Sequence, residues 1–150
     1  MMEPKKILWP TDFSKNAAQA LPYVTSLTEK YQTEIHLLYV IGGLAPNEPW
    51  YGELDRSHVD KIHRREEKMA ERRLDEICAK HLNGCPQYIK HVAIGDPAHE
   101  ILKFIEKEKM DMVVMAKRGR KGHFYFGSVS QKVVKNSPVP VVTIPIGSDN

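Results

Sequence analysis

The chain has 150 residues, of which 41% are hydrophobic and 27% are charged, the size and composition of one ordinary globular domain. Its net charge of +3 is too small to indicate a nucleic-acid-binding protein by itself. No apolar run approaches the roughly 20 residues of a membrane-spanning helix, and no signal peptide is visible. We therefore expect one domain over residues 1–150, in a protein of the cytoplasm.

The first part of the chain alternates between apolar runs and an amphipathic segment. Residues 6–10 (KILWP) and 34–41 (EIHLLYVI) are continuous apolar runs that predict buried strands. Between them, residues 14–31 place apolar side chains at helical spacing, with Ser14 as the expected N-cap. Pro22 lies inside this segment, which predicts a kink or a later start of the helix.

The middle of the chain combines a loop with a charged helix. Gly and Pro are frequent from about residue 41 to 57, which predicts a long loop. From about Ser57 to His81 the sequence predicts a long helix whose charged side chains face solvent. The apolar stripe of this helix consists of Val59, Ile62, Met69, Leu74 and Ile77.

The last part of the chain repeats the alternation of strands and helices. Asp96 is the expected N-cap of one helix, and Pro97 occupies its first position. Strands are expected at 87–95, 110–116 and 139–145, helices at 96–108 and 126–137, and a tail at about 146–150.

This alternation predicts an α/β fold, with a parallel sheet covered by helices on both faces. In such sheets, ligands bind beyond the carboxyl ends of the strands, where the strand order reverses. The loops of interest therefore follow Pro10, Val40, Ile94 and Met115.

Two of these loops leave two interpretations open. Asp12 follows the first strand, where its carboxylate could accept from an adenine amino group or a ribose hydroxyl. Alternatively, Asp12 or Ser14 simply caps the next helix. Gly95 follows the third strand and permits close approach of a ligand or backbone, although an ordinary strand-to-helix turn is slightly favoured.

The stretch after the fourth strand, MAKRGRKGHFYFGSVSQKV, is rich in glycine and in cations. Gly119, Gly122 and Gly127 allow backbone N–H groups to converge on an anion. Gly127 and Ser128 open a helix, whose free N–H groups and dipole favour negative charge. The stretch matches neither the P-loop nor the G-x-G-x-x-G dinucleotide pattern. Its cations are Lys117, Arg118, Arg120 and Lys121.

Three other kinds of site are less favoured. Nucleic-acid binding would use the KRGRK patch with the aromatic residues 124–126 as stacking partners, a small electrostatic footprint. A metal site at Cys78, His81 and Cys85 lacks a fourth ligand. Catalysis would need a nucleophile with a base and an orienting group, and no such set is apparent in the sequence.

Several segments, in this order, resemble the universal stress proteins: ILWPTDFS, HLLYV, VAIGDPAHEI, DMVVMAKRG and FGSVSQKVVKNSPVPVVTIP. They cover nearly the whole chain, and the last is the most specific. The resemblance implies a Rossmann-like fold of the adenine nucleotide alpha hydrolase type, with a five-stranded parallel sheet in the order 3-2-1-4-5. It also implies a homodimer formed through the last strand, at about 139–144.

The resemblance further implies an ATP site, with Mg or Mn on the phosphates. Asp12 would meet the adenine or ribose, and the backbone of Val40 would contact the adenine. The ribose and phosphates would be surrounded by Gly119, Gly127, Ser128 and Val129. Pro10, Thr11, Gly95, Met115 and Ala116 complete the implied pocket.

The chain departs from the family motif G-x2-G-x9-G-[ST] in two ways. Ala116 occupies the first glycine position, and seven residues rather than nine separate Gly119 from Gly127. The leading hypothesis is a regulatory dimer that binds ATP or a related adenine nucleotide and is not a dedicated enzyme. The alternative is a nucleotide-free dimer that engages a protein partner.

Overall fold

The computed structural model describes residues 4–42, 56–81, 88–117 and 127–145. Most of the expected loop, the C-terminal tail, Cys85 and the Gly- and Lys/Arg-rich segment 118–126 lie outside the described residues. Gly119, one of the expected site residues, falls within that segment.

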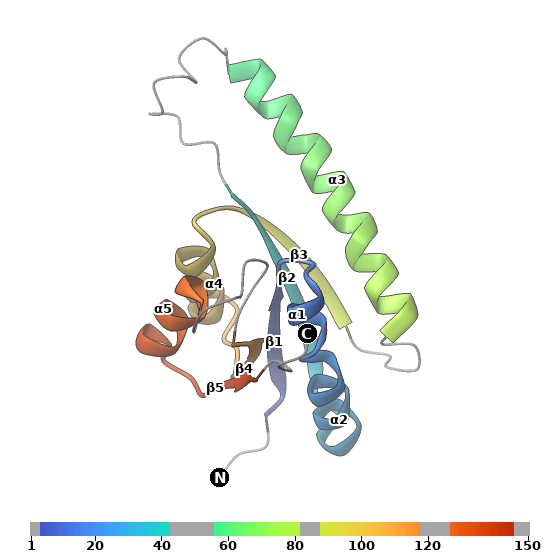
Figure 1. Ribbon diagram of the computed structural model, residues 1–150, viewed down its shortest axis with the longest axis vertical. Helices are drawn as coiled ribbons and strands as arrows, with labels where there is room; N and C mark the ends of the chain where they lie inside the picture. The colour runs from blue at the N-terminus through green and yellow to red at the C-terminus, as the bar shows by residue number, and fades with distance from the viewer. Residues whose placement is uncertain (1–3, 43–55, 82–87, 118–126, 146–150) are drawn as a thin grey trace.

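The described strands form one parallel sheet in the order β3-β2-β1-β4-β5, as expected (Figure 1). Their bounds are β1 Lys6–Thr11, β2 Glu34–Gly42, β3 Tyr88–Gly95, β4 Met112–Ala116 and β5 Val141–Ile144. Because β1 lies at the centre, its first neighbours are β2 on one side and β4 on the other. The apolar runs of β1, β2 and β4 account for the burial of these three strands, whereas β3 is largely exposed.

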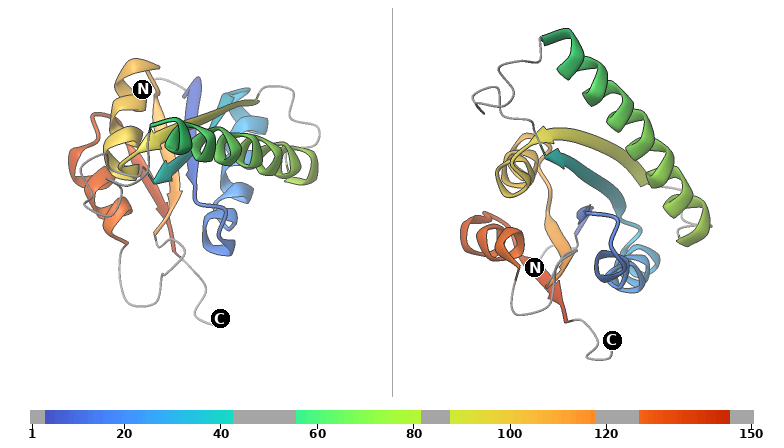
Figure 2. Two further views of the ribbon diagram at one scale, coloured as in Figure 1. Left: turned by 90° about the horizontal axis from the view of Figure 1, so that it is seen from above. Right: turned by 45° about the horizontal axis from the view of Figure 1, so that its top comes forward.

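Helices cover both faces of the sheet (Figures 1 and 2). Helices α1 (Lys15–Ala18), α2 (Leu21–Tyr31) and α3 (Arg56–His81) contribute to the core on one face. Helices α4 (Pro97–Lys107) and α5 (Ser128–Asn136) contribute to the core on the other face. The chain therefore changes faces between the helices that precede and follow β3.

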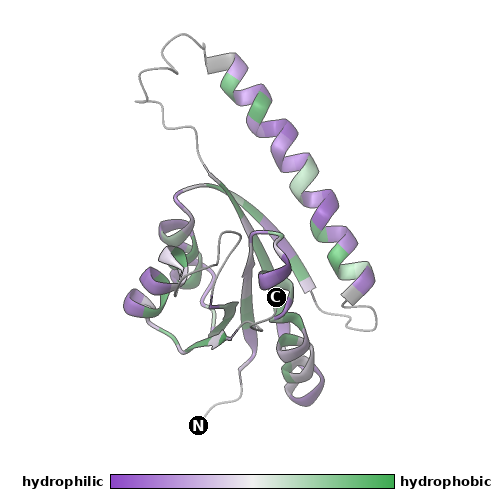
Figure 3. Cartoon of the chain, viewed as in Figure 1, coloured by the Kyte–Doolittle hydropathy of each residue, from purple (hydrophilic) through white to green (hydrophobic). Residues whose placement is uncertain are grey.

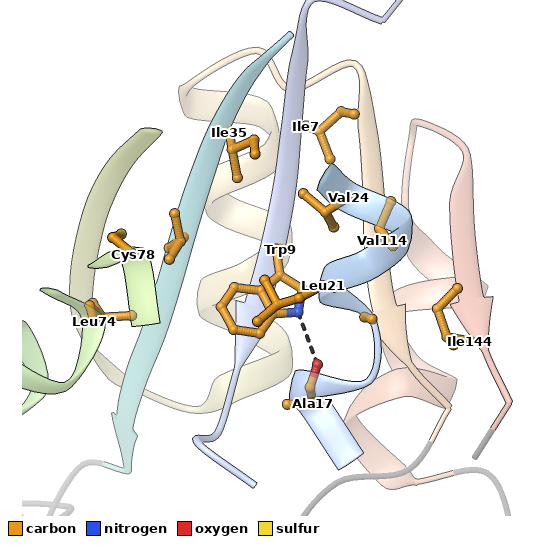
Figure 4. Packing of buried hydrophobic residues seen from close by; sticks show 12 residues of the cluster. Ile7, Trp9, Ala17, Leu21, Val24, Ile35, Leu74, Cys78, Val114 and Ile144 are labelled. Carbon is orange, nitrogen blue, oxygen red and sulfur yellow. Dashed lines mark hydrogen bonds between the residues drawn. The ribbon is translucent and has the colours of Figure 1, made fainter. Parts of the chain in front are cut away.

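Trp9 occupies the middle of the core beneath α1 and α2 (Figure 4). Its ring is completely buried, and its Nε1–H donates a hydrogen bond of 3.2 Å to the carbonyl of Ala17. This bond satisfies the polar atom of a buried indole and fixes α1 against β1. Leu21 and Val24 pack on the same face from α2.

The single helix expected at 14–31 is two helices in the structure. Helix α1 ends at Ala18, and α2 begins at Leu21, which places Pro22 in its first turn. A proline is tolerated there because the first-turn N–H groups have no partner within the helix. The prediction of a later start is confirmed.

The long loop is expected at about 41–57, and strand β2 and helix α3 each extend two residues into that range. Strand β2 continues to Gly42, which pairs with Gly95 of β3, and α3 already begins at Arg56. The pairing with β3 keeps Ile41 and Gly42 in the ladder, although Gly is a weak strand former. The last strand is shorter than expected, because Pro140 and Pro145 flank β5.

Helix α3 packs on the sheet along only part of its length. Ala70, Leu74 and Cys78 are buried, whereas Ile62 and Met69 are 40% and 57% exposed. Figures 1 and 3 show the first half of this largely hydrophilic helix projecting beyond the sheet. Only part of the apolar stripe predicted from the sequence therefore faces the core. No helix among the described residues combines the length and apolarity needed to cross a bilayer.

Candidate functional site

The central strand β1 and its neighbour β4 separate at their carboxyl ends. In the register of β1 and β4, Ile7 pairs with Met112 and Leu8 pairs with Val113, and no later residue of β1 pairs with β4. Pro10, which has no N–H to donate, lies in the part of β1 beyond this pairing. The helix after β1 covers one face of the sheet, and the helix after β4 covers the other. This is the topological switch point at which open α/β sheets bind ligands.

The turn after β1 is held by its own side chains. The Oγ1 of Thr11 accepts a hydrogen bond of 3.0 Å from the N–H of Phe13. The Oδ1 of Asp12 accepts from the N–H of Ser14 at 2.9 Å, and the Oγ of Ser14 accepts from the N–H of Ala17 at 3.0 Å. Ser14 is therefore the N-cap of α1, as expected, while Asp12 holds the turn before it.

Phe13 has a backbone conformation that is unusual for a residue with a side chain. Its φ is +65°, in the left-handed region. Its ring stacks on Tyr39 of β2 with centroids 4.3 Å apart, and the guanidinium of Arg73 in α3 lies 4.4 Å from its centroid. The sequence did not indicate this cluster, because its members are far apart and follow no common period.

Two hydrogen bonds join the beginning of α5 to the end of β4. The N–H of Gly127 donates to the carbonyl of Lys117 at 3.1 Å. One strand position earlier, the carbonyl of Ala116 accepts from the Oγ of Ser130 at 3.0 Å. These bonds place the first turn of α5 beside the carboxyl end of β4. The free N–H groups of that turn make it favourable for an anion.

Gly127 is the N-cap of α5, with φ −61° and ψ 151°. These angles are accessible to any residue, so the backbone does not require glycine here. Ser128 is the first residue of the helix and adds a hydroxyl to the same end.

Several expected site residues lie on the α4/α5 side of the sheet. Val40, Met115 and Val129 all pack with the core cluster that α4 and α5 cover. Strand alternation places the buried Pro10 on the same face. Ala116 is one position beyond Met115 and is only 6% exposed, so its methyl group is largely enclosed by protein.

Gly95 is required by its own turn. Its φ is +148°, and an added Cβ would lie 3.0 Å from Oε2 of Glu100. It ends β3, which is separated from β1 by β2. These contacts support the strand-to-helix turn that the sequence slightly favoured. As expected, Asp96 caps α4, accepting from the N–H of His99 at 3.0 Å.

The described residues contain no group of three or more His, Cys, Asp or Glu side chains arranged to hold a metal ion. Cys78, one member of the weak metal pattern, is buried in α3.

The fold and this arrangement define an α/β protein with a candidate ligand site at its switch point. The universal stress protein family model matches residues 3–145, and the chain belongs to that family. Universal stress protein MJ0531 of Methanocaldococcus jannaschii is 30% identical over 149 residues, covering 93% of this chain and 81% of that protein.

Solved structures share the fold. The structure of protein MJ0577, from the same archaeon, has a TM-score of 0.85 at 27% identity and covers 99% of this chain and 100% of its own. A family member from Arabidopsis thaliana with AMP bound has a TM-score of 0.61 at 20% identity, covering 97% of this chain and 94% of that one.

Proposed function

We propose that this chain binds an adenine nucleotide, ATP or a close relative, at the switch point of its sheet and acts as a regulatory homodimer. The observation that carries the proposal is the convergence of two features beyond the separated ends of β1 and β4. These are the Asp12 turn and the first turn of α5. The AMP-bound relative supports the choice of ligand class.

Each part of the site suits one part of the ligand. The N–H groups of Ser128 and Val129, which have no partner within the helix, are the proposed donors for phosphate oxygens. Asp12 is the acceptor for a ribose hydroxyl or the adenine amino group. The backbone of Val40 is the expected contact for adenine, and the apolar side chains of Val40 and Met115 line this face.

A Mg or Mn ion would accompany the phosphates. The hydroxyl of Ser128 is a hard oxygen donor, which suits these cations. The described residues offer no group of three or more metal-binding side chains, so phosphate oxygens and water would supply most of the coordination.

Equilibrium dialysis with labelled ATP tests the proposal. Asp12→Asn keeps an oxygen acceptor for the N–H of Ser14 but removes the charge, and we expect it to weaken binding about 10- to 100-fold. Asp60→Asn, an exposed change on α3, is the matched control and should leave the affinity unchanged. No retention of ATP by the wild-type chain at millimolar ligand would refute nucleotide binding.

Gly127→Trp provides an independent test. Because the φ of Gly127 is ordinary, a side chain there does not strain the backbone. Loss of binding in a variant with unchanged stability would therefore reflect obstruction at the first turn of α5. Unchanged binding would exclude this turn as the phosphate site.

The nucleotide-free interaction dimer remains the second candidate, because the chain departs from the nucleotide motif at Ala116 and in the seven-residue spacer. If protein purified from cells released no adenine nucleotide on heating and retained none in dialysis, this candidate would be favoured. Ala116→Gly then tests whether the methyl group of Ala116 prevents ATP binding. A gain of ATP binding in this variant would identify the methyl group as the obstacle.

A further inference from the structure

Phe13 is held in a conformation that it would not adopt alone. Its φ of +65° is rare for a bulky side chain, because the Cβ approaches the following carbonyl. Such strain persists only where the surroundings determine the conformation. At Phe13 the surroundings are the hydroxyl of Thr11, which accepts from its N–H, and two contacts of its ring.

The ring of Phe13 joins three separate elements. It belongs to the turn after β1, whereas Tyr39 comes from β2 and Arg73 from α3. Tyr39 is the register partner of Thr11, so this contact fixes the turn to the adjacent strand. Arg73 precedes the fully buried Leu74, so its backbone is anchored to the core. The ring is thus held by two elements whose positions the sheet already determines.

Asp12 directly precedes Phe13, so the orientation of the peptide between them depends on the φ angle of Phe13. Rotation of Phe13 back to a negative φ would turn the peptide that connects it to Asp12. The hydrogen bond from the N–H of Ser14 to Oδ1 of Asp12 spans the same residue and would be disturbed. The contacts of Phe13 therefore favour the backbone conformation in which Asp12 accepts from Ser14.

We propose that Phe13, through its contacts with Tyr39 and Arg73, is a positioning residue that holds Asp12 ready for the nucleotide. The inference rests on the proposed function, and it makes helix α3 a contributor to nucleotide affinity without direct contact. The turn is arranged before the ligand arrives, so less ordering is required on binding.

Two pairs of variants test the positioning role. Phe13→Leu removes the ring and Arg73→Gln removes the cation, and each should weaken nucleotide binding about three- to tenfold, the factor expected for one such contact. Phe13→Tyr and Arg73→Lys keep a ring and a cation, and should bind within about twofold of wild type. The double variant Phe13→Leu/Arg73→Gln should bind no more weakly than Phe13→Leu alone, because the two changes break the same contact.

Hydrogen exchange at the amide of Ser14 gives a readout that does not need the nucleotide. We expect faster exchange at Ser14 in Arg73→Gln, with unchanged exchange at the central amide of Leu38 in β2. Denaturant unfolding of each variant separates this local effect from a global loss of stability.

The outcomes distinguish the two proposals. If wild type binds nucleotide and the variants bind equally well, the positioning role is wrong and the proposed function stands. If the variants lose stability but keep wild-type affinity and Ser14 exchange, the ring is only a packing contact, which also overturns the inference. If wild type binds no nucleotide, the proposed function fails, and unchanged Ser14 exchange would show independently that the ring does not hold the turn.

Discussion

Two histidines lie side by side in the sheet, away from the candidate nucleotide site. The Nδ1 of His36 is 2.9 Å from the Nε2 of His91, and the Nε2 of His36 is 2.6 Å from the Oε1 of Glu34. An ionised carboxylate only accepts, so His36 donates through Nε2. Its Nδ1 is then an acceptor for the Nε2–H of His91.

This pair makes stability depend on pH. Burial lowers the pKa of His91 below 6.5, and the neighbouring His36 lowers it further, against an opposing effect of Glu108. The unfolded chain therefore takes up a proton at a higher pH than the folded chain does. The contribution of His91 is complete above pH 6.5 and is lost as the pH falls through its lower folded pKa.

We expect His91→Gln to reduce the loss of unfolding free energy between pH 7.5 and pH 5. Glutamine keeps an N–H donor for His36 but does not titrate in this range. Urea unfolding at a series of pH values measures the effect. An identical pH dependence in the variant and wild type would show that His91 titrates normally in the fold.

Gly95 has a backbone conformation that residues with a side chain rarely adopt. Gly95→Ala should destabilise the chain by about 1–3 kcal/mol, because φ is +148° and the new Cβ would contact Glu100. Gly42→Ala is the matched control, because Gly42 pairs with Gly95 in the sheet and no atom of the described residues lies within 4 Å of an added Cβ. Adding Glu100→Ala to Gly95→Ala removes the contact and separates it from the backbone strain. Equal stability of Gly95→Ala and Gly42→Ala would contradict this account.

At the scale of elements, α1 depends on its cap more than the other helices do. It has four residues, too few to be stable alone, and Ser14 supplies a side-chain acceptor at its start. Ser14→Ala should cost about 1 kcal/mol, while Ser14→Asp should retain most of the stability. Thermal or urea unfolding measures both, and equal losses would show that the cap is not the cause.

Local patterns predict elements well because the strands and most helices carry their own periodicity. Ser14 and Asp96 are confirmed as caps, and the alternation predicts the parallel sheet. The strand order came from the family resemblance, since periodicity does not specify which strands are neighbours. Helix α3 shows the same limit, because its apolar period does not reveal where the sheet beneath it ends. Ile62 and Met69 are consequently exposed.

Contacts between distant residues could not be predicted in this way. Ser14 and Asp12 were both plausible caps, and only coordinates distinguish the cap from the residue that holds the turn. The partners of Phe13 and of His91 come from other strands and helices, and no spacing rule connects them. The location of the candidate site stays a prediction, and only the contacts around it are described by the structure.

At the scale of the whole molecule, β5 is an edge strand that exposes an apolar side chain to solvent. Val142 is 38% exposed, and β5 pairs with β4 alone in the described sheet. An unpaired apolar edge favours association with another strand or a covering segment. We therefore retain β5 as the proposed dimer contact.

Val142→Lys should shift the chain from dimer to monomer, because two copies of the charge would face each other across a symmetric contact. Ile62→Lys is the control, since Ile62 has a similar exposure of 40% but lies on the projecting half of α3. Sedimentation velocity measures both. A dimeric Val142→Lys, or a monomeric wild type, would rule out β5 as the contact.

The hydrogen bond between Gly127 and Lys117 explains why the spacer before α5 can differ in length from the family motif. It joins Lys117, next to the end of β4, directly to Gly127, the N-cap of α5, so this contact does not depend on the number of residues between them. Removing two residues from such a segment changes the free energy of loop closure by only roughly 0.2 kcal/mol. The length of the spacer can therefore vary at little cost in folding free energy.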